Sequence, residues 1–207
     1  MAIVKAYFTQ SSEKIKKTLN YIVHRPGREG EKLSREFFGD TEESIRKEDA
    51  YGRLEAGEGM TFFHLKLNFH PEREDTRNDL NLRDITRRSI AALEERLQRR
   101  IHFLAVEHND HTDLRHIHAI ILVKLRRGER IGIEDWKVCR EMATEQARFQ
   151  RKVLDAVMRV QKDRQQGKAH CPHQLVCTAM LVARQHRKNT VFSGFCMCRI
   201  LVRNAAV

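Results

Sequence analysis

Three histidines with short, regular spacing are the residues of this chain best suited to chemistry. They are His108, His116 and His118, in the stretch FLAVEHNDHTDLRHIHAIILVK over residues 103–124. Residues i and i+2 of a strand point to the same side, so His116 and His118 are predicted to face one point. A turn over residues 109–115 would bring His108 back beside them. Three imidazole nitrogens that leave room for water and substrate oxygens are typical of a catalytic metal site.

The other polar residues of this turn have weaker claims to a role. Asp110 could accept a hydrogen bond from a ligand imidazole, or it could hold the turn as an Asx motif. His111 and Asp113 are interpreted as turn residues rather than ligands. The alternative for the His-x-His pair is two strand histidines hydrogen-bonded on a solvent-facing surface. The third histidine and the apolar strands on either side favour the metal site.

The elements that must position these histidines follow from hydrophobic periodicity. The alternating or apolar stretches predict strands over residues 2–8, 60–70, 101–107 and 116–124. Helical patterns are expected at 11–24, with Ser11 or Ser12 as N-cap, and at 41–57, 79–100 and 133–166. The third of these helices has four core candidates, namely Ile85, Ile90, Leu93 and Leu97. Because the last two strands are joined by a short turn, we expect antiparallel neighbours in a sheet backed by helices, an α+β fold.

Composition points to a basic protein with a polyanionic partner. The chain has 207 residues and 39 Lys and Arg against 28 Asp and Glu, a formal net charge of +11. Such an excess makes nucleic acid the first partner to consider. A basic loop after the first helix supplies candidate phosphate contacts at Arg25, Arg28 and Lys32, and the arginines of the 79–100 helix are either further contacts or a solvated face. No apolar run is long enough for a membrane span and no signal peptide is visible, so a cytoplasmic protein is expected.

Two segments resemble a known family of enzymes. HNDHTDLRHIHAIIL resembles the three-histidine motif of the relaxases, the mobilisation nickases of the His-hydrophobic-His endonuclease superfamily. TLNYIVHRPGREGEKL, near the N-terminus, is similar to their first motif, in which a tyrosine precedes a basic, glycine-containing segment. The resemblance covers roughly residues 1–125. It departs from the pattern at Arg115, where such motifs commonly have a proline before the His-x-His pair.

The resemblance implies a fold, a site and a reaction. The fold would be a central antiparallel sheet of about five strands with flanking helices. A divalent metal, Mg²⁺ or Mn²⁺, would bind His108, His116 and His118, and Tyr21 would be the nucleophile. The alternatives to Tyr21 are Tyr7, expected in the strand core, and Tyr51, expected on a helix surface. The substrate would be single-stranded DNA at an origin of transfer, with accessory mobilisation proteins as candidate partners.

The expected function is therefore metal-dependent DNA nicking and strand transfer through a 5′ phosphotyrosine intermediate. A rolling-circle replication or transposition initiator would use the same residues on a different DNA site. The alternative from another class is a non-catalytic DNA-binding module derived from a relaxase.

The domain organisation expected from these features has three parts. Residues 1–130 would form the catalytic domain, 131–165 a helical extension and 166–207 a small module. That module has enough soft ligands for a structural Zn²⁺, although their spacing is not that of a standard zinc finger: Cys171, His173, Cys177, Cys196 and Cys198. The alternative is a set of reduced, partly buried thiols.

Overall fold

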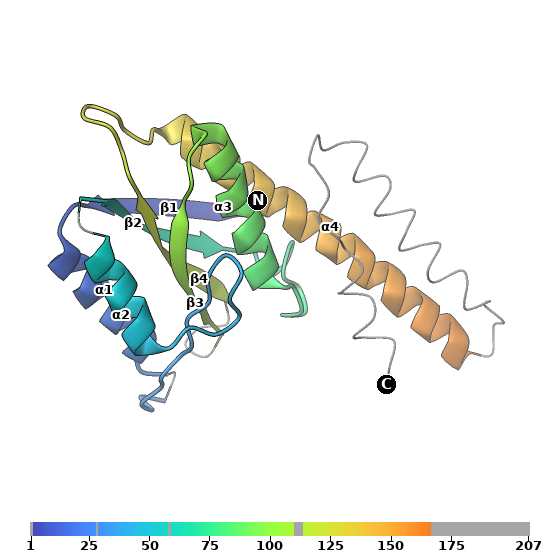
Figure 1. Ribbon diagram of the computed structural model, residues 1–207. Coiled ribbons are helices and arrows are strands. Elements are labelled where there is room, and N and C mark those ends of the chain that lie inside the picture. The colour runs from blue at the N-terminus through green and yellow to red at the C-terminus, as the bar shows by residue number, and fades with distance from the viewer. Residues whose placement is uncertain (1, 28, 58, 110–113, 167–207) are drawn as a thin grey trace. The chain divides into compact units, whose positions relative to one another are not determined.

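The computed structural model describes residues 2–27, 29–57, 59–109 and 114–166. In chain order the elements are β1 (Ile3–Thr9), α1 (Ser12–His24), α2 (Lys47–Ala56), β2 (Thr61–Asn68), α3 (Leu82–Leu97), β3 (His102–His108), β4 (His116–Val123) and α4 (Ile133–Gln165) (Figure 1). The chain divides into two compact units, Met1–Arg151 and Lys152–Val207, so the boundary falls within α4. The candidate site lies wholly in the first unit.

The first unit has the expected α+β fold. Its four strands pair only in antiparallel fashion, in the order β1-β2-β4-β3. The described residues therefore contain four of the roughly five strands that the relaxase resemblance implies. Strand β4 is buried along its whole length because strands flank it on both edges and helices cover both of its faces.

Helices α1 and α2 cover the sheet face that also presents the histidines (Figure 1). Helix α1 begins where Ser11 accepts a hydrogen bond from the backbone N–H of Lys14, as expected of an N-cap. Its apolar residues recur at helical spacing and are buried against Phe62, Val106 and Ile120 of the sheet. This packing sets the end of α1 beside the end of β3 that carries His108.

Helix α3 and the first part of α4 cover the opposite face. Ile85, Ile90 and Leu93 of α3 are buried as predicted, whereas Leu97 is only half-buried because it lies in the last turn. Cys139 of α4 is buried against α3, where its Sγ donates to the carbonyl of Ser89 at 3.2 Å, and burial raises the pKa of this thiol to about 12.

Two further predictions were wrong in detail. The helix expected from residue 41 begins only at Lys47, because Ile45 is drawn into a bridge in which its N–H donates to the carbonyl of Phe37. Tyr7 is not a core residue: β1 lies at an edge of the sheet and 59% of Tyr7 is exposed. The alternation of residues in a strand does not show that α1 and α2 would leave this part of the face uncovered.

The described residues contain no helix that is both long enough and apolar enough to cross a membrane.

Candidate metal centre

The antiparallel pairing of β3 and β4 brings the three predicted histidines together. His108 lies directly opposite His116, and His118 is two residues farther along the same face of β4. The ring centroids are 4.8 to 5.1 Å apart, and one nitrogen from each ring lies within 4.8 Å of the others. All three side chains are buried. Together they could hold a metal ion.

Backbone carbonyls fix the orientation of two of these rings. Nε2 of His108 donates to the carbonyl of Ile22 at the end of α1, at 2.8 Å, and Nδ1 of His116 donates to the carbonyl of Leu114 at 2.9 Å. The nitrogens that remain for a metal are Nδ1 of His108 and Nε2 of His116, and both atoms are buried. A ring held in this way presents one defined nitrogen to a metal.

The third ring is held by a fourth histidine. Nδ1 of His118 lies 2.8 Å from Nε2 of His64 on β2, and the two rings stack with centroids 5.0 Å apart. When Nδ1 of His118 carries the proton and donates to Nε2 of His64, Nε2 of His118 is the unprotonated nitrogen that can bind a metal. Burial, followed by the neighbouring histidines and Lys66, lowers the pKa of His118 from 6.5 to about 2. His118 is therefore a neutral imidazole, the form that binds a metal.

His64 was missed by the sequence analysis, although a signal was present. Placing Phe63, Leu65 and Leu67 on one face of β2 puts His64 and Lys66 on the other, but nothing in the local pattern shows that β4 lies beside that strand.

Replacing His64 by phenylalanine is expected to weaken Mn²⁺ binding roughly 10- to 100-fold, the usual effect of losing a hydrogen-bond partner behind a metal ligand. The ring volume is kept while the acceptor nitrogen is lost. His64→Gln restores an acceptor and is expected to recover part of the affinity. Isothermal titration calorimetry would measure both variants, and equal affinities for His64→Phe and the wild-type protein would contradict the assigned hydrogen bond.

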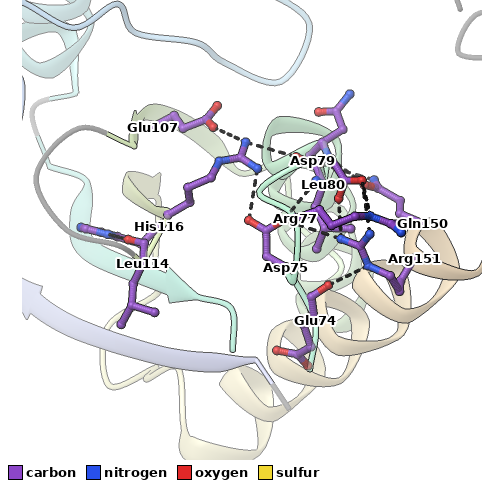
Figure 2. Close-up of polar contacts among 12 residues, drawn as sticks. Glu74, Asp75, Arg77, Asp79, Leu80, Glu107, Leu114, His116, Gln150 and Arg151 are labelled. Atoms are coloured by element: carbon purple, nitrogen blue, oxygen red, sulfur yellow. Dashed lines mark hydrogen bonds and ion pairs between the residues drawn. The ribbon is translucent and has the colours of Figure 1, made fainter. Parts of the chain in front are cut away.

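Arg115, the residue that departs from the relaxase pattern, anchors the backbone beside His116. Its guanidinium donates to Asp75 at 3.1 Å, to Glu107 at 2.7 Å and to the carbonyl of Leu80 at 3.2 Å (Figure 2). Because Glu107 directly precedes His108, this one side chain joins the residues next to two of the three histidines.

Asp75 is held from several sides at once. Its side chain is only 4% exposed and one oxygen accepts from the backbone N–H of Leu80 at 3.1 Å. Arg151 of α4 lies 3.9 Å from the same carboxylate and also donates to the carbonyl of Glu74 (Figure 2). The histidine hairpin is thus tied to the loop between β2 and α3 through buried charge.

Tyr21 lies in the last part of α1, next to the residue whose carbonyl holds His108. The side chain is 59% exposed, and Cζ of Arg25 is 5.8 Å from its ring centroid. Tyr7 is equally exposed and its ring centroid is 6.0 Å from that of His64. Tyr51, by contrast, packs against the core with its hydroxyl donating to Asn20 at 3.4 Å, and burial raises its pKa. Tyr51 is therefore the tyrosine least suited to react.

The basic residues proposed as phosphate contacts are differently placed. Arg25 and Lys32 lie after α1, Lys32 exposed and Arg25 half-buried. Arg35 of the same loop has a structural role instead, because it donates to the carbonyls of Val23 and Arg25 at the end of α1. All four arginines of α3 form ion pairs on the opposite side of the sheet from the histidines, as do two that follow the helix: Arg83, Arg87, Arg88 and Arg96, then Arg99 and Arg100.

Several predicted site residues lie outside the described residues. They are Asp110, Arg28 and the proposed zinc ligands Cys171, His173, Cys177, Cys196 and Cys198.

Comparison of the chain with known protein families, with curated proteins and with solved structures found no match.

Proposed function

We propose that this protein is a relaxase-like, metal-dependent enzyme that nicks and rejoins single-stranded DNA at an origin of transfer. The observation that carries the proposal is the cluster of His108, His116 and His118 directly beside the end of the helix that bears Tyr21. Three neutral imidazoles leave the full charge of a divalent cation available. Mg²⁺ or Mn²⁺ bound there would polarise a phosphodiester and offset the negative charge that develops in the transition state.

Tyr21 supplies the nucleophile in this proposal. Its phenolic oxygen loses a proton to solvent and forms a bond to phosphorus, while the bond from phosphorus to the 3′ oxygen breaks. The 3′ oxygen takes up a proton and leaves as a hydroxyl, and the 5′ phosphate stays on the tyrosine. Arg25, whose Cζ lies 5.8 Å from the ring centroid of Tyr21, supplies a positive charge that attracts the DNA phosphate to this ring. Because the ester bond is retained in the phosphotyrosine, the reverse reaction rejoins the strands without ATP.

Covalent capture of DNA tests this function. Single-stranded oligonucleotides tiled across the DNA that surrounds the gene are incubated with the protein and Mn²⁺, or with chelator, and resolved on a denaturing gel. Tyr21→Phe is expected to lower adduct formation by at least roughly 1000-fold, because the variant has no nucleophilic oxygen. Tyr7→Phe and Tyr51→Phe are the matched controls and are expected to keep the adduct.

Other outcomes would redirect the assignment. An adduct that persists in Tyr21→Phe and disappears in Tyr7→Phe would move the nucleophile to β1. Salt-sensitive binding without any adduct, on DNA that includes the true origin, would favour the non-catalytic binding module. An adduct formed only on DNA of a replication origin or a transposon end would favour the initiator function instead.

A further inference from the structure

A row of two lysines extends from the metal centre to the open edge of the sheet. Lys66 of β2 lies directly opposite His118 of β4, and Lys5 of β1 lies directly opposite Lys66. Directly opposed residues of antiparallel strands point to the same side, with Cβ atoms roughly 5 Å apart. Lys5, Lys66 and His118 therefore form one line across the face of three strands. We call Lys5 and Lys66 the lysine row.

The lysine row gives the fold no evident benefit. Like charges directly opposite one another on a sheet destabilise the strand pair. Within the described part of the chain, neither lysine has a carboxylate at ion-pair distance. Burial lowers the pKa of Lys66, and the positive charges of Arg25 and Lys5 lower it further. The three cations are therefore close enough to repel one another. A concentration of positive charge beside a metal centre suits an anionic ligand.

Two exposed aromatic rings accompany these cations. Tyr7 is two residues from Lys5 on the same face of β1, and it is 59% exposed. Tyr21, equally exposed, is the ring beside Arg25. Edge strand β1 leaves this face open: Ile3, Lys5 and Tyr7 are all exposed. Cations that follow a backbone and aromatic rings that stack on bases are the combination that binds single-stranded nucleic acid.

We propose that single-stranded DNA runs from the metal centre across Lys66 and Lys5 to the β1 edge, with Tyr7 stacking on a base. This inference rests on the proposed function for the identity of the ligand and adds the path of the strand. Charge complementarity favours DNA as the ligand of this surface, because the chain carries a net charge of +11 and the lysine row holds no acidic side chain. The contacts expected from sequence, in the loop after α1, would then be supplemented by residues of the sheet itself.

Equilibrium binding in chelator tests the path without any chemistry. The full chain is titrated with a fluorescent oligothymidylate of about 20 nucleotides at several NaCl concentrations, with anisotropy as the readout. The variant Lys5→Ala/Lys66→Ala loses two phosphate contacts. The slope of log K against log salt is therefore expected to become less steep by roughly 1.4, and the affinity at 0.1 M salt is expected to fall about 25-fold. Tyr7→Ala is expected to lose roughly 5- to 150-fold in affinity with the slope unchanged.

Matched variants distinguish the effect of the lysine row on DNA binding from the effect of the overall positive charge. Arg127→Ala/Arg130→Ala removes the same charge from exposed residues beyond the far end of β4 and is expected to keep the wild-type affinity within about twofold. Lys5→Arg/Lys66→Arg is expected to keep the slope. Thermal unfolding of each variant verifies that it is folded, and the singly substituted, exposed Lys5→Ala is expected to show about half of the slope change.

The outcomes distinguish this inference from the proposed function. If the Lys5/Lys66 and Arg127/Arg130 variants lose equal affinity, the row is wrong, while adduct formation by Tyr21 would still support the enzyme. If the wild-type protein fails both to bind the oligonucleotide and to form an adduct, both proposals fail. Competition by polyglutamate at equal charge, together with an unaltered Tyr7→Ala, would overturn the DNA path in favour of an acidic protein partner.

Discussion

Replacing His116 by asparagine is expected to abolish tight metal binding, with a loss of Mn²⁺ affinity of more than about 100-fold. Loss of a hydrogen-bond partner behind a ligand costs roughly 10- to 100-fold, and loss of a ligand costs more. In the wild-type protein, Mn²⁺ at 100 times its Kd is expected to stabilise the fold by about 2.7 kcal/mol. For a chain of this size that corresponds to a rise in Tm of roughly 5 to 11 °C. His116→Asn is expected to lose this rise.

The matched control for this variant is His102→Ala. His102 is on the same face of β3 but is exposed, at the opposite end of the strand from His108. The His102→Ala protein is expected to keep the full metal-dependent rise in Tm, measured by circular dichroism with and without chelator. A rise of the same size in His116→Asn would show that the metal binds elsewhere, and the candidate centre would be wrong.

Replacing Arg115 by methionine is expected to destabilise the metal-free protein by about 3 to 5 kcal/mol, the usual cost of removing one partner of a buried ion pair. The reason is the carboxylates left behind: Asp75 and Glu107 have side chains only 4% and 18% exposed, and both now accept from this guanidinium. Methionine keeps most of the volume and loses the charge. Urea unfolding should show a lower midpoint.

An exposed arginine provides the comparison for Arg115. Arg88 pairs with Asp84 at 3.0 Å, as close as the pair between Arg115 and Asp75, but Arg88 is 34% exposed and lies one turn from its partner on α3. Arg88→Met is therefore expected to cost only about 0.3 to 0.5 kcal/mol. Equal losses for the two substitutions would contradict the anchoring role of Arg115. At urea concentrations at which Arg115→Met is still folded, weaker Mn²⁺ binding by this variant than by the wild-type protein would show that Arg115 helps to position His116.

Much of the fold could be predicted from local sequence patterns. Helix α3 could be predicted because its apolar residues recur at helical spacing, and Ser11 marks the start of α1 with a side chain that accepts a backbone N–H group. The hairpin of β3 and β4 could be predicted because two apolar strands separated by a short turn have little choice but to pair. These features depend on residues close in sequence.

The candidate metal centre could also be predicted in part from local sequence patterns. His116 and His118 share a face because alternation in a strand has a period of two, and the short turn returns His108 to them, so the sequence by itself predicted the three-histidine cluster. The chemical suitability of imidazole for a metal also needs no tertiary structure.

Only the tertiary structure decided what surrounds that cluster. Insertion of β2 between β1 and β4 brings His64 to His118 and places Lys66 and Lys5 in line with it. Helix packing left Tyr7 exposed, and the ion pairs of Arg115 joined residues 40 positions apart in the chain. The physical reason is that strand order, register and buried charge pairs are stabilised by contacts between distant segments, and no local period records which segments will meet.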